Sequence, residues 1–80
     1  MSIPSRDIVA RLREQFPAGT RVELVKMDDP YNRILKPGSL GTVRFVDAIG
    51  TLQVDWDCGS SLGVVYGEDE VRIVKGDADI

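Results

Sequence analysis

The chain has 80 residues, with ten lysines and arginines against thirteen aspartates and glutamates, no histidine and one cysteine. A chain of this length forms one domain, and it buries only about 60% of the surface that its unfolded form exposes. The net charge of −3 argues against a large phosphate-binding surface, because such surfaces are basic. The lack of histidine excludes Ser-His-Asp and Cys-His sites within the chain, and with a single cysteine it excludes the usual tetrahedral zinc sites.

The single cysteine, Cys58, cannot form a disulfide within the chain, which favours a reducing compartment. No stretch reaches the ~20 apolar residues that a transmembrane helix needs. The first residues also lack the apolar segment of a secretory signal. We therefore expect a soluble, cytoplasmic protein that does not bind membranes.

The first predicted element is a helix over residues 4–16. Ser5 is a suitable N-cap, and Asp7 lies in the first turn, where the helix dipole favours a carboxylate. Apolar side chains recur along one stripe, which comprises Ile8, Val9, Leu12 and Phe16. A helix of about three turns is not stable alone in water, so the stripe must dock on the rest of the chain or on a partner. Docking on a second copy would make the helix a weak self-association site.

Five short strands are predicted after the helix from the alternation of apolar and polar side chains. They span residues 20–26, 40–47, 51–56, 61–66 and 71–74. Residues 27–36 are predicted to form a long first loop or a splayed hairpin, because Pro30 disfavours a central strand. Gly41 marks a bend or a close approach of two backbones, and residues 76–80 form a frayed, flexible polar tail.

This order of elements is that of an SH3-like barrel. We therefore predict an all-β fold, a small five-stranded antiparallel barrel over residues 19–75, with an N-terminal helix over residues 1–18 added to it in a single domain. The aromatic side chains of Phe16, Phe45 and Trp56 are candidates for the core.

Several short motifs lie between residues 17 and 74: GTRVEL at 19–24, MDDPY at 27–31, PGSLGTV at 37–43, VD at 46–47 and VDWDCGSSL at 54–62. Gly67 and Asp69 follow them. In combination these motifs resemble a small family of uncharacterised bacterial and phage-associated domains of unknown function. The resemblance implies an SH3-like fold and occurrence in bacteria and mobile elements, and it implies no activity.

The long first loop carries the first candidate binding site. SH3-like barrels bind peptides through aromatic-lined grooves beside this loop. The candidate peptide-binding residues are Met27, Asp28, Asp29, Tyr31 and Tyr66. Their acidic members favour a basic or proline-containing peptide. The first interpretation is therefore a non-enzymatic module that binds an unidentified protein or peptide.

The basic residues provide an alternative, because they are concentrated in the first half of the chain. From residue 47 onward there are eight acidic residues against two basic ones. A basic face on the helix and first loop would suit a nucleic-acid-binding accessory module of a bacterial or mobile-element system. The candidate residues are Arg11, Arg13, Arg33, Lys36 and Arg44. A structural self-assembly domain, joined through the helix stripe, is a third hypothesis.

No catalytic residue, metal site or cofactor is predicted. Cys58 follows Asp57, whose negative charge disfavours a reactive thiolate. The segment from Asp55 fails the spacing of a calcium loop, because positions 5, 6 and 12 are Gly59, Ser60 and Tyr66. We therefore expect that the protein is not an enzyme.

Overall fold

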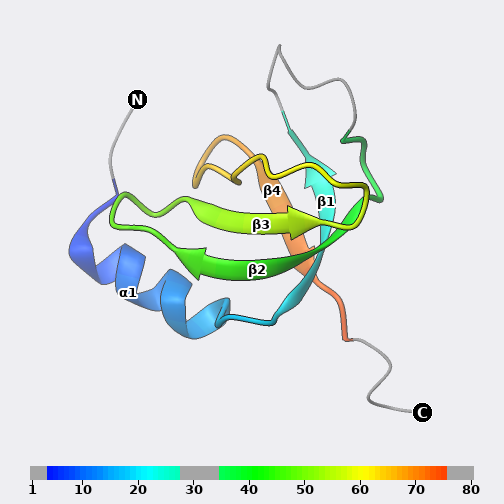
Figure 1. Ribbon diagram of the computed structural model, residues 1–80. Helices are drawn as coiled ribbons and strands as arrows, with labels where there is room; N and C mark the ends of the chain where they lie inside the picture. Colours follow the sequence, from blue (N-terminus) through cyan, green and yellow to red (C-terminus); the bar gives the residue numbers. More distant parts are fainter. Residues whose placement is uncertain (1–3, 28–34, 76–80) are drawn as a thin grey trace.

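The computed structural model describes residues 4–27 and 35–75. Helix α1 (Arg6–Gln15) precedes four strands, which are β1 (Arg21–Lys26), β2 (Leu40–Val46), β3 (Leu52–Trp56) and β4 (Glu70–Ile73). The strands form one antiparallel sheet in the order β3-β2-β1-β4. Figure 1 shows a strongly bent sheet in which β1 and β4 run across the direction of β2 and β3. The described part of the chain is therefore mostly β, with one open sheet and one helix.

The predicted helix is confirmed, with slightly shorter bounds. The hydroxyl of Ser5 accepts a hydrogen bond from the backbone N–H of Ile8 at 3.3 Å, and Asp7 lies in the first turn. The helix ends at Phe16, whose N–H donates to the carbonyl of Leu12 at 2.8 Å. The capping signals that define the helix in the sequence therefore define it in the structure.

The apolar stripe of α1 packs on the chain's own sheet. Val9, Leu12 and Phe16 are buried in the same cluster as the inward side chains of the first three strands. Those strand residues are Val22, Leu24, Val43, Val46, Leu52, Val54 and Trp56. Figure 1 shows α1 beside β2. The helix and the sheet thus share one core, and the predicted burial of Trp56 and Phe16 is confirmed.

The predicted burial of Phe45 is wrong, because β2 contains a β-bulge. Val43 pairs with Val54, but Phe45 pairs with Gln53, so Arg44 is an extra residue in β2. A bulge of this kind bends a strand and shifts which side chains face inward. The inward position after Val43 is therefore taken by Val46, and the side chain of Phe45 is 50% exposed.

The expected strand over residues 61–66 is reduced to a single bridge, and the described residues show four strands in place of the five predicted. Only one pair from this segment joins the sheet: Leu52 and Val64 exchange two backbone hydrogen bonds of 2.9 Å. The described residues therefore form a four-stranded open sheet, and residues 61–66 pair with the free edge of β3 through a single bridge.

Two side chains bind the backbone groups of Leu62, which lie two residues before Val64 and would continue the ladder toward β3. The indole N–H of Trp56 donates to the carbonyl of Leu62 at 2.8 Å. The N–H of Leu62 donates to the hydroxyl of Ser60 at 3.3 Å, and the N–H of Val65 donates to the carboxylate of Asp69 at 2.9 Å. Local side-chain bonds of this kind compete with strand pairing.

The outer face of the sheet carries an ion pair across three elements. The Arg21 guanidinium donates two hydrogen bonds, of 2.8 and 2.6 Å, to the carboxylate of Asp57, and a third of 2.8 Å to the hydroxyl of Thr42. The hydrogen bond from Arg21 lowers the pKa of Asp57 below its usual value. Desolvation of the carboxylate raises the pKa and so opposes this effect, whereas the positive charge of Arg21 lowers the pKa further.

We expect this ion pair to make the stability of the protein sensitive to acid. A carboxyl whose pKa is lowered by folding stabilises the folded state above its unfolded pKa of about 4, and loses this effect as the pH falls toward its folded pKa. Urea unfolding at pH 7 and pH 3 measures it. The variant Asp57→Asn should be less stable than the natural protein at pH 7, and the difference should shrink at pH 3.

Asp55→Asn is the matched control, because the Asp55 carboxylate lies 3.7 Å from the Nε of Arg44 in a looser, exposed pair. An Asp57→Asn difference that is the same at both pH values would contradict the prediction.

Candidate functional site

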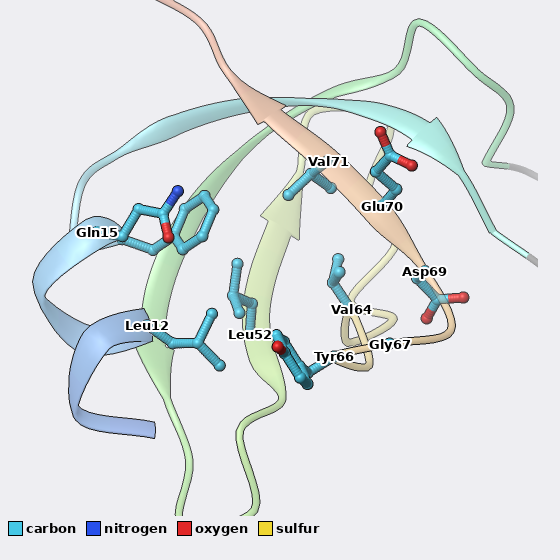
Figure 2. Close-up of a pocket in the computed structure, with 10 residues that line it drawn as sticks. Leu12, Gln15, Leu52, Val64, Tyr66, Gly67, Asp69, Glu70 and Val71 are labelled. Atoms are coloured by element: carbon cyan, nitrogen blue, oxygen red, sulfur yellow. The ribbon is translucent and has the colours of Figure 1, made fainter. Parts of the chain in front are cut away.

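A cavity of about 240 Å³ opens between α1 and β4, and we call it the α1–β4 groove (Figure 2). Its walls come from the helix, from β3, from the turn before β4 and from β4 itself. The lining residues are Leu12, Gln15, Phe16, Leu52, Val64, Tyr66, Gly67, Asp69, Glu70 and Val71. The groove thus joins residues that are up to 59 positions apart (12 to 71) in the sequence.

The floor of the groove is apolar. Leu12, Leu52 and Val64 belong to the buried core, and Val71 packs against that core from β4. Figure 2 shows the side chains of these residues directed into the space between the helix and the last strand. Because the floor is continuous with the core, its shape is held by the same packing that holds the fold.

Tyr66 lies at the mouth of the groove, and a turn over residues 65–69 holds it there. The N–H groups of Glu68 and Asp69 donate to the carbonyl of Val65 at 3.1 and 2.9 Å, and the Asp69 carboxylate accepts from the N–H of Val65. Gly67 has a φ of 86°, which glycine adopts without strain. The Tyr66 side chain is 47% exposed, and Figure 2 shows it pointing toward Leu12 of α1. An aromatic ring is therefore fixed over an apolar floor.

The rim of the groove is acidic. Asp69 and Glu70 are among the lining residues, with their carboxylates directed outward (Figure 2), Glu68 is exposed in the same turn, and none of the described lining residues is a lysine or arginine. The electrostatic potential at the rim therefore favours cations.

The predicted peptide-binding residues separate into three groups. Tyr66 lines the α1–β4 groove. Met27 is partly buried against the core and is not among the lining residues of the groove. Asp28, Asp29 and Tyr31 lie outside the described residues. The sequence predicts Leu12 on the apolar stripe of the helix and Val71 in the last strand. It does not predict that a groove lies between them, because the groove depends on how the helix and the strand pack.

The predicted nucleic-acid residues come together only in part. Arg13 of α1 and Arg44 of β2 line one hollow beside Phe45. Arg11 is exposed on α1 and lines neither that hollow nor the α1–β4 groove. Lys36 precedes the start of β2, whereas Arg44 is near its end. Arg33 lies outside the described residues.

Cys58 is a free, exposed thiol in the turn after β3. Within residues 4–27 and 35–75, no three Cys, Asp or Glu side chains are grouped closely enough to hold a metal ion. In the same part of the chain, no helix has the length and hydropathy needed to cross a membrane.

The family model of a domain of unknown function, DUF4314, matches residues 5–74. The chain belongs to the DUF4314 family. The match begins at the N-cap of α1 and ends one residue after β4, so the DUF4314 domain contains the helix, the whole sheet and every residue that lines the α1–β4 groove. No curated protein and no solved structure matches the chain.

Proposed function

We propose that the protein is a non-enzymatic module that binds a short segment of a protein partner, and that the α1–β4 groove takes an apolar side chain of that segment. The observation that carries the proposal is the half-exposed Tyr66 ring over a buried apolar floor with an acidic rim. Aromatic anchors beside fully buried pockets supply most of the binding energy in protein interfaces.

The size of the groove favours a side chain over a small-molecule cofactor. Pockets for drug-sized ligands measure roughly 300–1,000 Å³, and this groove has about 240 Å³. One side chain would fill it, and the flanking residues of the segment would lie along the rim. Asp69 and Glu70 favour lysine or arginine at those flanking positions. A basic or proline-containing segment therefore remains the best ligand.

We also propose that the fold is an open variant of an SH3-like barrel. The strand order β3-β2-β1-β4 supports this proposal. The bridge between Leu52 and Val64 lies on the free edge of β3, where a fifth strand of the barrel would pair. The bend of the sheet is a second support (Figure 1). The exposed, unpaired Cys58 suits the cytoplasm, and the sequence motifs suit a bacterial or mobile-element protein.

Selection from a random peptide library with the immobilised protein tests the function. We expect enriched peptides to carry one large apolar residue or a proline with lysine or arginine on at least one side. For an enriched peptide, Tyr66→Ala should weaken binding about tenfold or more, because it removes the exposed ring. Glu70→Lys should weaken it by reversing a rim charge. Fluorescence anisotropy of the labelled peptide gives the dissociation constants.

The matched control is Ile49→Ala, because Ile49 is the more exposed apolar side chain, at 56%, and lies outside the groove. This variant should bind the peptide as the natural protein does. Enrichment of acidic peptides, or equal effects of Tyr66→Ala and Ile49→Ala, would contradict the proposed function.

Self-association through the helix stripe is not part of this proposal. Val9, Leu12 and Phe16 are buried in the chain's own core, so self-association through them would require α1 to leave the sheet.

A further inference from the structure

A second surface lies on a different face of α1 from the α1–β4 groove. It consists of two hollows that share Arg13. One, of about 210 Å³, lies between the end of α1 and the end of β2, and the other, of about 360 Å³, lies beside the start of α1. Three arginines and one exposed aromatic residue line these hollows, and we call them the arginine–Phe45 patch: Arg6, Arg13, Arg44 and Phe45. The other lining residues are small or apolar.

The patch is basic although the chain has a net charge of −3. Three arginines line the two hollows, and none of the described residues that line them carries a carboxylate. Within residues 4–27 and 35–75, no salt bridge involves Arg6 or Arg13. Arg21 and Arg72 differ, because they pair with Asp57 and Glu23. Positive charge is therefore left uncompensated on this face, which favours an anionic ligand.

Arg44 contributes to the same charge, because its ion pair is weak. Its Nε lies 3.7 Å from the carboxylate of Asp55, and both side chains are more than half exposed. Pairs of this kind contribute little and exchange readily for a better anion. Arg13 has a fixed position, since its Nε donates to the carbonyl of Val46 at 3.2 Å.

Phe45 gives the patch an exposed aromatic face. The bulge at Arg44 turns this ring out of the core, and half of the side chain is exposed. The guanidinium carbon of Arg44 lies 5.8 Å from the centroid of the ring, which is within the range of a cation–π contact. A flat aromatic ring flanked by guanidinium groups is the arrangement with which proteins bind single strands: bases stack on the ring and phosphates contact the cations.

We infer that the arginine–Phe45 patch binds single-stranded nucleic acid. An unpaired base stacks on Phe45, and the neighbouring phosphates contact Arg44, Arg13 and Arg6. Stacking accepts any base, so binding has little sequence preference. A duplex hides its base faces and binds less well. Among the described residues, the two hollows share only the buried Phe16 with the α1–β4 groove, so this inference goes beyond the proposed peptide binding and is tested separately.

The test is fluorescence anisotropy of a labelled 12-nucleotide oligo-dT with the full chain, at several salt concentrations. Phe45→Ala should weaken binding about tenfold, in line with the contribution of one stacked base. Arg6→Gln and Arg44→Gln should each lower the slope of log K against log salt by ~0.7, the value for one lost phosphate contact on a single strand.

Arg11→Gln is the matched control, because it removes the same charge from an exposed position of α1 that lines neither hollow. It should leave the slope unchanged. Tyr66→Ala should also leave oligo-dT binding unchanged, which separates this site from the peptide groove. Amide NMR shifts of the natural protein should change around Arg13 and Phe45 on addition of oligo-dT, and this readout does not depend on the folding of any variant.

Three outcomes would overturn the inference. The first is no binding of oligo-dT at low salt. The second is a loss of binding in Arg11→Gln as large as that in Arg44→Gln. The third is equally tight binding of oligo-glutamate that is insensitive to Phe45→Ala, which would assign the patch to an acidic protein partner.

Discussion

Replacing Trp56 with alanine is expected to remove about 3–5 kcal/mol from the free energy of unfolding. Trp56 is the only tryptophan, it is 3% exposed, and its ring packs in the core beneath β2. Typical stabilities of roughly 0.05–0.15 kcal/mol per residue give an 80-residue chain about 4–12 kcal/mol in total. The variant therefore loses a large part of its stability, and urea unfolding followed by circular dichroism measures the loss.

Trp56→Phe separates packing from hydrogen bonding. It keeps an apolar ring but removes the indole N–H that donates to the carbonyl of Leu62 at 2.8 Å. A buried acceptor left without its donor costs about 1–3 kcal/mol. We also expect faster hydrogen exchange at the N–H of Val64, which donates to Leu52 in the single bridge. Exchange at Val64 that stays as slow as in the natural protein would show that Trp56 does not hold this segment.

The sequence was sufficient to predict the elements whose signals are local. The capping residue Ser5 and the stripe of Val9, Leu12 and Phe16 located α1. Alternation located β1, β2, β3 and β4 to within one residue at each end. Such patterns are reliable because the same face of each element must be buried whatever its neighbours are.

Two errors arose where a pairing partner decides the outcome. Alternation placed Phe45 beside Val43 on the inner face, but it cannot reveal that Arg44 forms a bulge opposite β3. Alternation also predicts a strand around Val64, although the side chains of Trp56 and Ser60 bind the backbone groups of Leu62 that this strand would need. In both places, a hydrogen-bonding choice overrides the hydrophobic pattern.

The candidate sites were harder to predict than the fold. Tyr66 and Arg13 were recognised as binding candidates from their residue types. Their neighbours were not: the α1–β4 groove needs Leu12 and Val71 on either side of a gap, and the second patch needs Phe45 on the outer face. The first arrangement is a consequence of how α1 packs beside the bent sheet, and the second depends on the bulge at Arg44; no spacing within the sequence encodes either of them.

Gly41→Ala is expected to destabilise the protein by about 1–3 kcal/mol, the usual cost of overpacking a core. A Cβ atom on Gly41 would lie 2.7 Å from Cγ1 of Val54, 2.8 Å from Cε3 of Trp56 and 3.1 Å from the carbonyl oxygen of Asp55. All three atoms belong to β3, which is held to β2 by strand pairing. Neither the buried ring nor the backbone can therefore move away without breaking other contacts.

Gly63→Ala is the matched comparison, because a Cβ on Gly63 would also meet an atom at 2.7 Å. That atom is the methyl group of Thr51, a partly exposed side chain, and the segment around Gly63 is held to β3 by one bridge and the bonds of Trp56 rather than by a full ladder. The segment can therefore shift, and we expect a smaller loss of stability than for Gly41→Ala. Urea unfolding midpoints of the two variants decide between the alternatives. An equal or larger loss in Gly63→Ala would mean that the segment is held as firmly as a paired strand, and would contradict the prediction.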